Sequence, residues 1–197
     1  MPGLRFGKTR SVFEPVLNAI IGQRVPVKAA MRSYLGLVRK YGQPAPGPQG
    51  LWLQPAPAVL AALPYEAFHP FGIERKRADT LRRAAHRANR LEEAATMPSV
   101  DAAARLTALP GIGEWTASQV VQVVLGDPDS VMVGDYKLPS FVTWNLAGEP
   151  RGDDARMLEL LEPYRGHRAR VVRLLKAGGE SPPRYGPRLE VMPVESW

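Results

Sequence analysis

The chain has 197 residues, a hydrophobic content of 45% and a net charge of +7, a composition typical of a globular protein rather than a disordered one. It contains no Cys, which excludes disulfides, Cys-ligated zinc, iron–sulfur clusters and a cysteine nucleophile. No apolar run reaches the ~18 residues of a membrane span, and no apolar segment of a signal peptide follows the basic N-terminus. We therefore expect a soluble, cytoplasmic protein without a membrane partner.

Apolar spacing predicts helices along most of the chain, and no segment alternates with the period of a strand. Ser11 is expected to cap the first helix, with Glu14 at the spacing of a capping box. The expected helices are 13–23, 27–42, 57–63, 74–93, 99–109, an apolar helix that follows a turn at 109–113 and ends near 126, 139–148, 153–164 and 165–179. The sequence thus predicts an all-α protein, with a Pro- and Gly-rich loop at 43–57.

Two further segments lie outside this helical pattern. Residues 128–138 are expected to be irregular, and the Pro-rich residues 177–197 are expected to form a C-terminal tail. The remaining residues, 1–176, are assigned to one folded core.

Basic residues are mostly Arg, with 20 Arg against six Lys. Because a guanidinium group can donate two hydrogen bonds to one phosphate, this balance is typical of nucleic-acid-binding proteins. An Arg- and Ala-rich composition also follows from a GC-rich genome, so charge alone leaves both readings open.

A Gly-rich turn, LPGIG at 109–113, separates two predicted helices. Gly111 and Gly113 permit backbone conformations that other residues avoid. They leave the first N–H groups of the next helix unshielded, and such groups bind anions together with the helix dipole. The turn is therefore a candidate phosphate-binding hairpin, and an ordinary turn between two helices is the alternative.

Asp135 follows 22 residues after Gly113, in the apolar segment VMVGDYKL. A carboxylate in such surroundings is either a helix cap or turn residue, or a partly desolvated functional group. A lone Gly-Asp is more commonly a cap or turn residue, and only the coupling of Asp135 to the hairpin raises the functional role.

Taken together, FEPVLNAIIGQRVPVKAA, LPGIGEWTA, GDYKL and EPYRGHRARVVRLL resemble the helix–hairpin–helix (HhH-GPD) DNA glycosylases, above all 3-methyladenine DNA glycosylase II. The resemblance covers residues 13–175. It implies two helical lobes around a central cleft that binds DNA and the base. Only about a dozen residues precede Phe13, so the N-terminal β-domain of longer members is expected to be missing.

The resemblance implies that Asp135 is the catalytic residue of a glycosylase that flips alkylated purines out of duplex DNA and leaves an abasic site in base excision repair. A carboxylate stabilises the oxocarbenium character of the sugar and orients or deprotonates water. Bases such as 3-methyladenine and 7-methylguanine are cationic and leave without a strong general acid. Two alternatives remain: a glycosylase for hypoxanthine or an oxidised base, and a non-catalytic DNA-binding module.

Trp115 occupies the position at which bifunctional relatives carry a lysine nucleophile. An indole forms no Schiff base, so no lyase activity is expected. By resemblance Trp115 stacks on the flipped base, although a core role is the alternative. Further candidates for the base pocket are Gln119, Tyr136 and Tyr164.

The resemblance also implies a set of DNA contacts and a cation site. A wedge that fills the gap of the flipped base is expected at Gln23 or Arg24, although Arg24 is equally a candidate surface charge. Backbone-binding candidates are Gly111, Gly113, Thr116, Arg165, Arg168, Arg170 and the Arg-rich helix 75–90, whose solvated face is an alternative explanation. Backbone carbonyls of Thr107, Leu109 and Ile112 are candidate ligands of a structural Na⁺ or K⁺. No other cofactor is expected, and the protein is expected to be a monomer.

Overall fold

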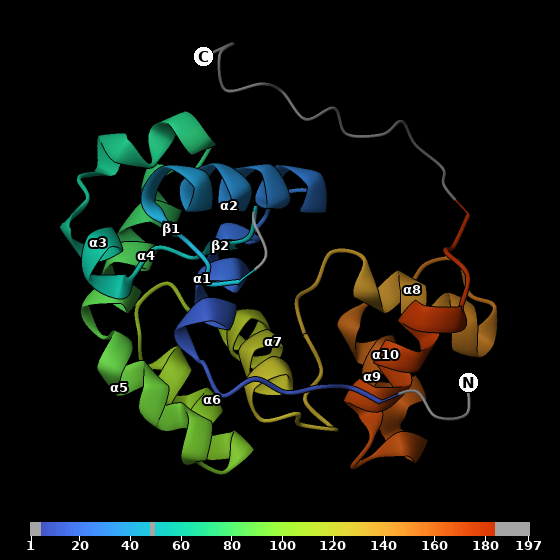
Figure 1. Cartoon of the computed structure of the whole chain (residues 1–197). Coiled ribbons are helices and arrows are strands. Elements are labelled where there is room, and N and C mark those ends of the chain that lie inside the picture. The colour runs from blue at the N-terminus through green and yellow to red at the C-terminus, as the bar shows by residue number, and fades with distance from the viewer. Residues whose placement is uncertain (1–4, 48–49, 184–197) are drawn as a thin grey trace.

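The structure is a computed structural model that describes residues 5–47 and 50–183 (Figure 1). It confirms the predicted all-α class. The α-helices of the described residues are α1 (Phe13–Ile21), α2 (Val27–Tyr41), α3 (Pro57–Ala62), α4 (Arg75–His86), α5 (Ala88–Glu92), α6 (Ser99–Thr107), α7 (Glu114–Val124), α8 (Leu138–Ala147), α9 (Asp154–Leu161) and α10 (Arg168–Gly178). Short 3₁₀ turns occur at η1 (Tyr65–Ala67), η2 (His69–Phe71), η3 (Glu93–Thr96) and η4 (Glu162–Tyr164).

One small sheet was not predicted. Strands β1 (Gln43–Pro44) and β2 (Trp52–Leu53) pair in antiparallel register, with Gln43 opposite Leu53. Leu51, Trp52 and Leu53 remain exposed, so this hairpin contributes little to the core. The two-residue strands were too short to show a periodic pattern.

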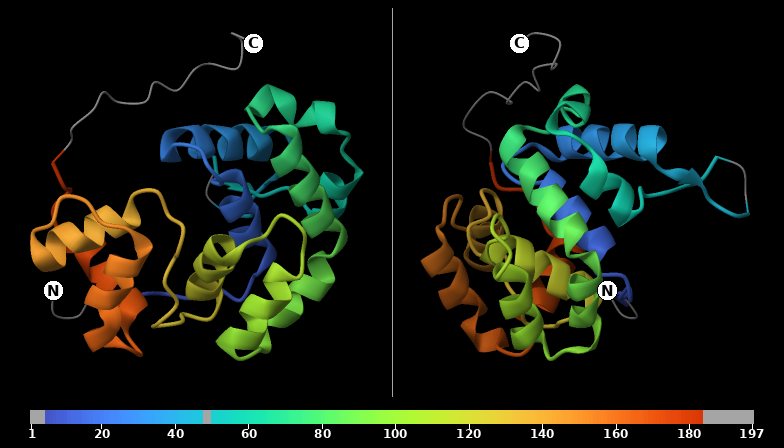
Figure 2. Two further views of the ribbon diagram at one scale, coloured as in Figure 1. Left: turned by 180° about the vertical axis from the view of Figure 1, so that it is seen from behind. Right: turned by 90° about the vertical axis from the view of Figure 1, so that its left-hand side faces the viewer.

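The helices form two lobes with separate hydrophobic cores. The larger lobe contains α1 to α7, and the smaller lobe contains α8, α9 and α10 (Figures 1 and 2). The N-terminal segment connects them, because Phe6 lies against the guanidinium group of Arg173 in α10 and the Thr9 N–H bonds to the Val123 carbonyl of α7. The predicted tail begins in the last turn of α10, and its residues 184–197 lie outside the described residues.

Helix α1 is the centre of the larger lobe and buries seven of its nine residues. The predicted cap at Ser11 is wrong: the carboxylate of Glu92 accepts hydrogen bonds from the N–H groups of Val12 and Phe13, at 2.9 and 2.8 Å. At the other end, the buried guanidinium of Arg77 donates to the Ile21 carbonyl at 2.8 Å. An anion at the N-terminus and a cation at the C-terminus both oppose the helix dipole.

The single helix predicted at 74–93 is two helices. Arg87, between α4 and α5, leaves the helical conformation with φ −111° and ψ 16°. This break keeps α5 against α1 and brings Glu92 to the α1 N-terminus. No helix of the described residues is long and apolar enough to cross a membrane.

Candidate active site

The hairpin at 109–113 joins α6 to α7 as predicted, and its geometry explains its glycine. Gly111 has φ +99°, and a Cβ atom there would lie 2.2 Å from the Thr80 hydroxyl of α4. Leu109 and Ile112 are buried in the larger core and anchor the turn. A residue with a side chain at position 111 would therefore both strain the backbone and push α4 away.

Two side chains from other elements hold the hairpin in place. The Gln23 amide nitrogen donates to the Gly111 carbonyl at 3.0 Å and to the Thr116 hydroxyl at 2.9 Å. Arg83 of α4 donates to the Pro110 carbonyl at 3.2 Å. Of the two predicted wedge candidates, Gln23 is therefore hydrogen-bonded to the hairpin. Arg24 is exposed and has φ 56°, in the left-handed region that few non-glycine residues adopt.

The start of α7 has the properties of an anion site. Gly113 is its N-cap, and no side chain caps the helix, so the first N–H groups have no intrahelical partner. The Thr116 side chain is buried and accepts a hydrogen bond from Gln23. On the opposite side of the turn, the Leu109 carbonyl accepts the Ile112 N–H and retains its second lone pair.

Asp135 lies in the loop before α8, and both of its carboxylate oxygens are engaged. Oδ1 accepts the N–H groups of Lys137 and Leu138, each at 2.8 Å. Oδ2 accepts the indole N–H of Trp115 at 2.9 Å. The cap and the functional reading of Asp135 are therefore compatible: one oxygen caps the start of α8, and the other faces the hairpin helix.

The surroundings of Asp135 favour its ionised form. Burial alone would raise the pKa of this carboxyl, but the N–H groups of Lys137 and Leu138, the Trp115 indole and the positive charge of Lys176 together lower its pKa. The charge is therefore present at neutral pH.

Lys176 of α10 is a site residue that the sequence did not indicate. Desolvation lowers the pKa of its ammonium group, while the charge of Asp135 acts in the opposite direction. The residue as a whole is exposed, although its ammonium group is partly desolvated. Only the fold brings Lys176 near Asp135, across 41 residues of sequence.

Trp115 links the two lobes. It belongs to α7 of the larger lobe, packs against the hydrophobic core of the smaller lobe, and bonds to Asp135. Its ring also approaches the loop after α1, because a Cβ atom on Gly22 would lie 3.9 Å from it. Helix α7, the loop that contains Gly22 and the loop that contains Asp135 therefore meet at the indole ring of Trp115.

The other base-binding candidates have different positions. Gln119 lies one turn after Trp115 on α7. Tyr136 follows Asp135 and is 88% exposed. Tyr164 is in η4, before the N-terminus of α10, whereas Lys176 near Asp135 is in the last turn of α10. Gln119 and Tyr136 thus lie near the Trp115–Asp135 pair along the chain, whereas Tyr164 belongs to a turn at the opposite end of α10 from Lys176.

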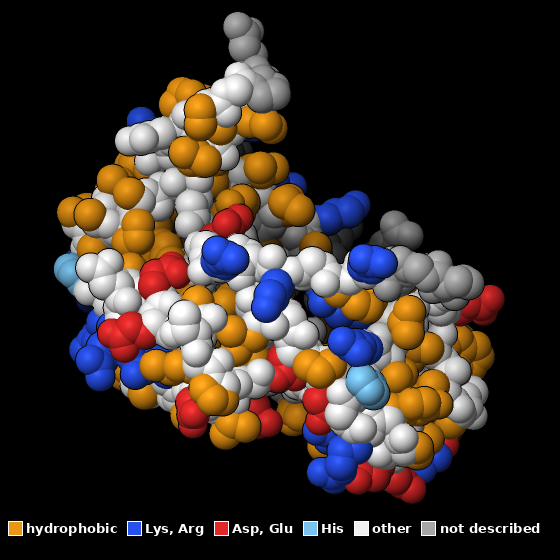
Figure 3. Space-filling model, turned by 60° about the horizontal axis from the view of Figure 1, so that its bottom comes forward, with side chains coloured by type: hydrophobic (Ala, Val, Ile, Leu, Met, Phe, Trp, Pro, Cys, Tyr) orange, Lys and Arg blue, Asp and Glu red, His pale blue; other side chains and the backbone are white. Residues whose placement is uncertain are grey.

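The predicted DNA-binding arginines Arg165 and Arg168 differ in exposure and in the carboxylate that each one pairs with. Arg168 forms an ion pair with Asp129, with 2.9 Å from Nε to Oδ1. Arg165 is exposed and pairs with Glu162 at the surface. Lys and Arg side chains gather across the middle of the face in Figure 3 and recur at its lower edges, with Asp and Glu side chains between them.

A pocket of about 400 Å³ lies between the lobes. Side chains from α6, α7, α9, α10 and the 128–138 loop line it, among them Asp127 and Asp129. Asp135 and Trp115 are not among its lining residues. This pocket therefore corresponds to only one part of the predicted central cleft, the part that contains Asp129. The candidate catalytic pair, Asp135 and Trp115, lies outside the pocket.

Comparison with known proteins agrees with this architecture. DNA-3-methyladenine glycosylase 2 of Escherichia coli is 34% identical over 168 residues, which cover 84% of this chain and 58% of that protein. No family model matches the chain. The chain spans 28% to 58% of the length of the curated relatives that it matches.

Solved structures share the fold. A 3-methyladenine DNA glycosylase from Archaeoglobus fulgidus has a TM-score of 0.73 at 24% identity, covering 85% of this chain and 59% of that one. The Schizosaccharomyces pombe 3-methyladenine DNA glycosylase in complex with abasic DNA has a TM-score of 0.72 at 20% identity, covering 87% and 82%. An 8-oxoguanine glycosylase/lyase from Clostridium acetobutylicum has a TM-score of 0.68 at 15% identity, covering 85% and 60%. With its hairpin and its two-lobed helical arrangement, the chain has the fold of the helix–hairpin–helix DNA glycosylases, and its sequence is similar to that of DNA-3-methyladenine glycosylase 2.

Proposed function

We propose that the chain is a monofunctional DNA glycosylase that extrudes alkylated purines, of the 3-methyladenine and 7-methylguanine type, from duplex DNA. The observation that carries this proposal is the ionised carboxylate of Asp135, held by the indole of Trp115 beside the hairpin. The glycosidic bond between C1′ and the base breaks, the bonding electrons leave with the base, and water adds to C1′.

Asp135 acts on the positive charge that develops on the sugar. An anion fixed before the reaction stabilises that charge without a cost of reorganisation. The N–H groups of Lys137 and Leu138 fix one oxygen, so the carboxylate presents its second oxygen in a constant direction. That oxygen also orients the attacking water and accepts its proton. Because an alkylated purine is cationic before cleavage, it leaves as a neutral base.

Trp115 supplies the stacking surface for the base. An electron-rich indole attracts a cationic ring, and the bond to Asp135 fixes the orientation of the ring. Tyr136, which is exposed beside Asp135, is proposed to cover the base from outside. Trp115 offers no amine for a Schiff base, so an abasic site is the proposed product.

The hairpin and the loop after α1 are proposed to grip the DNA backbone. Backbone N–H groups at Gly111, Gly113 and Thr116 bind one phosphate, and a monovalent cation on the carbonyls of Thr107, Leu109 and Ile112 would add positive charge there. Arg24 is the proposed wedge, because Gln23 is engaged with the hairpin. Arg165 is the more accessible of the two predicted phosphate-binding arginines of the smaller lobe.

Single-turnover release of 3-methyladenine and 7-methylguanine from methylated duplex DNA tests the proposal, with Asp135→Asn as the variant. Asn remains a good helix cap, so α8 keeps its cap while the charge and the acceptor of the Trp115 indole N–H are removed. We expect release to fall about hundredfold or more. Asp101→Asn, at an exposed position of α6, is the matched control and should leave release unchanged. Equal release by wild type and Asp135→Asn would contradict the role of Asp135.

Borohydride trapping tests the absence of lyase activity. A monofunctional enzyme gives no covalent complex with abasic DNA and no strand break before alkali treatment. If a complex is trapped, the monofunctional assignment is wrong, and Lys176, which faces Asp135, is the first residue to substitute.

A further inference from the structure

The basic residues of helix α4 fall into two groups that differ in their contacts. In the first group every guanidinium has a partner within the larger lobe. Arg75 lies over a tyrosine ring at 5.8 Å, and the buried Arg77 donates to a carbonyl of α1. Arg82 forms an ion pair with Asp79, one turn away on the same helix. These arginines are therefore used for packing and for local charge balance.

The second group lies on one face of α4. Lys76, Arg83 and the C-cap residue Arg87 are seven and four residues apart, and Thr80 lies between the first two at the same helical spacing. Lys76 and Arg87 are exposed. Within the described part of the chain, no carboxylate pairs with any of these three basic side chains. We call Lys76, Arg83 and Arg87 the α4 stripe.

The α4 stripe lies beside the hairpin. A Cβ atom at Gly111 would lie 2.2 Å from the Thr80 hydroxyl, so this face of α4 packs directly on the turn. Arg83 donates to the Pro110 carbonyl and to the Thr80 hydroxyl, each at 3.2 Å. The other two members of the stripe lie one helical turn before Thr80 and one turn after Arg83. The stripe therefore extends past the hairpin in both directions along α4.

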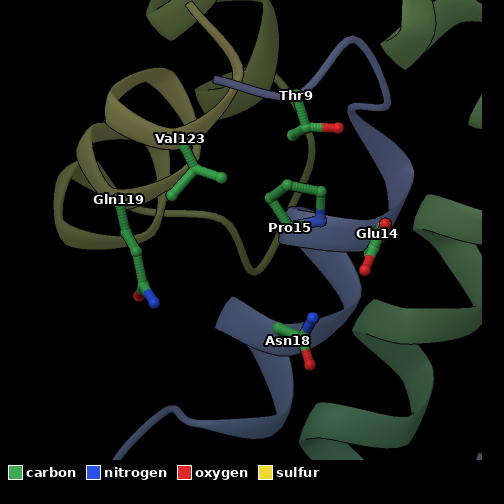
Figure 4. A pocket seen from close by; sticks show the side chains of 6 residues that line it. All are labelled: Thr9, Glu14, Pro15, Asn18, Gln119 and Val123. Carbon is green, nitrogen blue, oxygen red and sulfur yellow. The ribbon is translucent and has the colours of Figure 1, made fainter. Parts of the chain in front are cut away.

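The opposite side of α1 has a different character. The pocket between α1 and α7 is lined by Thr9, Glu14, Pro15, Asn18, Gln119 and Val123 (Figure 4). Glu14 is the charged side chain in this lining, and its carboxylate disfavours a phosphate there. The α4 stripe instead offers three cations beside the hairpin.

The length of the α4 stripe suits a DNA strand. Lys76 and Arg87 are eleven residues apart, which is roughly 16 Å along a helix axis. One strand of duplex DNA carries a phosphate about every 3.4 Å along its axis. The stripe is therefore long enough to meet several phosphates of a strand that also contacts the hairpin.

On the basis of the glycosylase function proposed above, we propose that the α4 stripe is a second phosphate-binding surface, which holds the DNA backbone that flanks the phosphate at the hairpin. Lys76 and Arg87 bind phosphates directly, and Arg83 adds its charge while it supports the turn through Pro110. Because phosphate contacts carry no sequence information, the stripe binds undamaged and damaged duplexes alike. It supplies affinity while the protein searches for a lesion, and it does not select the lesion.

The test is the affinity of the full chain for two duplexes of one sequence, measured by fluorescence anisotropy over a series of salt concentrations. One duplex is undamaged, and the other contains a tetrahydrofuran abasic analogue. Lys76→Gln and Arg87→Gln each remove one cation of the stripe. Arg39→Gln and Lys40→Gln are the matched controls, because both residues are exposed in the last turn of α2 and form no ion pair among the described residues.

We expect each stripe variant to lose roughly fivefold in affinity at 0.1 M salt, equally on both duplexes. The slope of log K against log salt should become less steep by about 0.9, the contribution of one phosphate contact. Lys76→Arg and Arg87→Lys keep the charge and should bind like wild type. The two controls should retain the wild-type slope.

Two results would overturn the α4 stripe. One is wild-type affinity and slope in both stripe variants, and the other is an equal loss in the controls, which would assign the effect to net charge. Release of methylated purines separates these results from the glycosylase proposal. If wild type releases base and the stripe variants bind normally, the stripe is wrong and the glycosylase proposal stands. If the stripe variants lose affinity and wild type releases no base, the stripe stands as a DNA-binding surface and the glycosylase proposal fails. A wild type that binds neither duplex contradicts both.

Discussion

Two aspartates in the loop before α8 are only six residues apart and have opposite surroundings. Asp129 forms an ion pair with Arg168 and accepts the N–H groups of Gly166 and Arg168. The hydrogen bond from the Arg168 side chain is the main cause that lowers its pKa to about 2. Asp135 forms no ion pair among the described residues, and its direct donors are two backbone N–H groups and the Trp115 indole.

The difference bears on the roles proposed for the two carboxylates of this loop. A carboxylate neutralised by a guanidinium has little charge left to offer a cationic transition state. The groups that hydrogen-bond to Asp135 are neutral and fix its direction without cancelling its charge, and Lys176 acts on it through its electric field, with no ion pair between the two among the described residues. We therefore propose that Asp129 serves the attachment of α10 and that Asp135 is the catalytic carboxylate.

Asp135→Glu should have the largest effect, because it keeps the charge and moves it. The longer side chain displaces the carboxylate by about one bond and disturbs the cap of α8. A displacement near 1 Å costs about hundredfold in rate. Single-turnover release of 3-methyladenine checks this, and a rate close to wild type would mean that the exact position of the charge is unimportant.

Trp115→Phe should lower the rate by about tenfold. The ring for stacking remains, but the N–H that favours the ionised form of Asp135 is lost. The pKa of Asp135, now lowered, should move back upward, so the acid limb of the pH–rate profile should shift to higher pH. An unchanged acid limb would separate Trp115 from the charge of Asp135.

Asp129→Ala should affect stability and leave the rate per folded molecule unchanged. It removes the ion pair and two backbone contacts at the start of α10, with an expected loss of about 1–2 kcal/mol in the free energy of unfolding. Because the folded pKa lies near 2, below the ordinary value of about 4, this contribution is present above pH ~4 and is lost as the pH falls toward 2. Urea unfolding at pH 7 and pH 3 should show a smaller difference in the variant than in wild type.

Glu92→Gln should have the smallest effect, about 1 kcal/mol. The amide retains one acceptor for the N-terminus of α1, and it loses the charge that opposes the helix dipole. Thermal unfolding of this variant is compared with that of Glu66→Gln, the same charge-removing change at an exposed position of η1. The comparison separates the effect of the lost cap from that of a lost surface charge. Equal melting temperatures would mean that α1 does not depend on its distant cap.

Local pattern was sufficient to predict most helices and the Gly turn, because α1, α2 and α7 each have an apolar stripe. It was insufficient where a partner far along the chain decides the structure. Glu92 replaces Ser11 as the cap of α1, and the break at Arg87 follows from packing against that helix. A pattern within a short window of sequence cannot indicate these contacts, because their partners lie far apart along the chain.

The site was predicted to a similar extent. The sequence indicated Asp135 and Trp115 separately, and the structure joins them by a hydrogen bond. It did not indicate Lys176, the pairing of Arg168 with Asp129, or the contact of Gln23 with the hairpin. These contacts are decided by how the lobes pack, and the residue types alone are equally compatible with solvent exposure.

The most direct test of this account measures Asp135→Asn and Asp129→Asn side by side. Each protein is assayed for single-turnover release of methylated purines and for thermal unfolding. We predict that Asp135→Asn loses release about hundredfold or more and unfolds like wild type, whereas Asp129→Asn unfolds at a lower temperature and retains release. Loss of release in Asp129→Asn with normal release in Asp135→Asn would contradict the assignment of the two carboxylates.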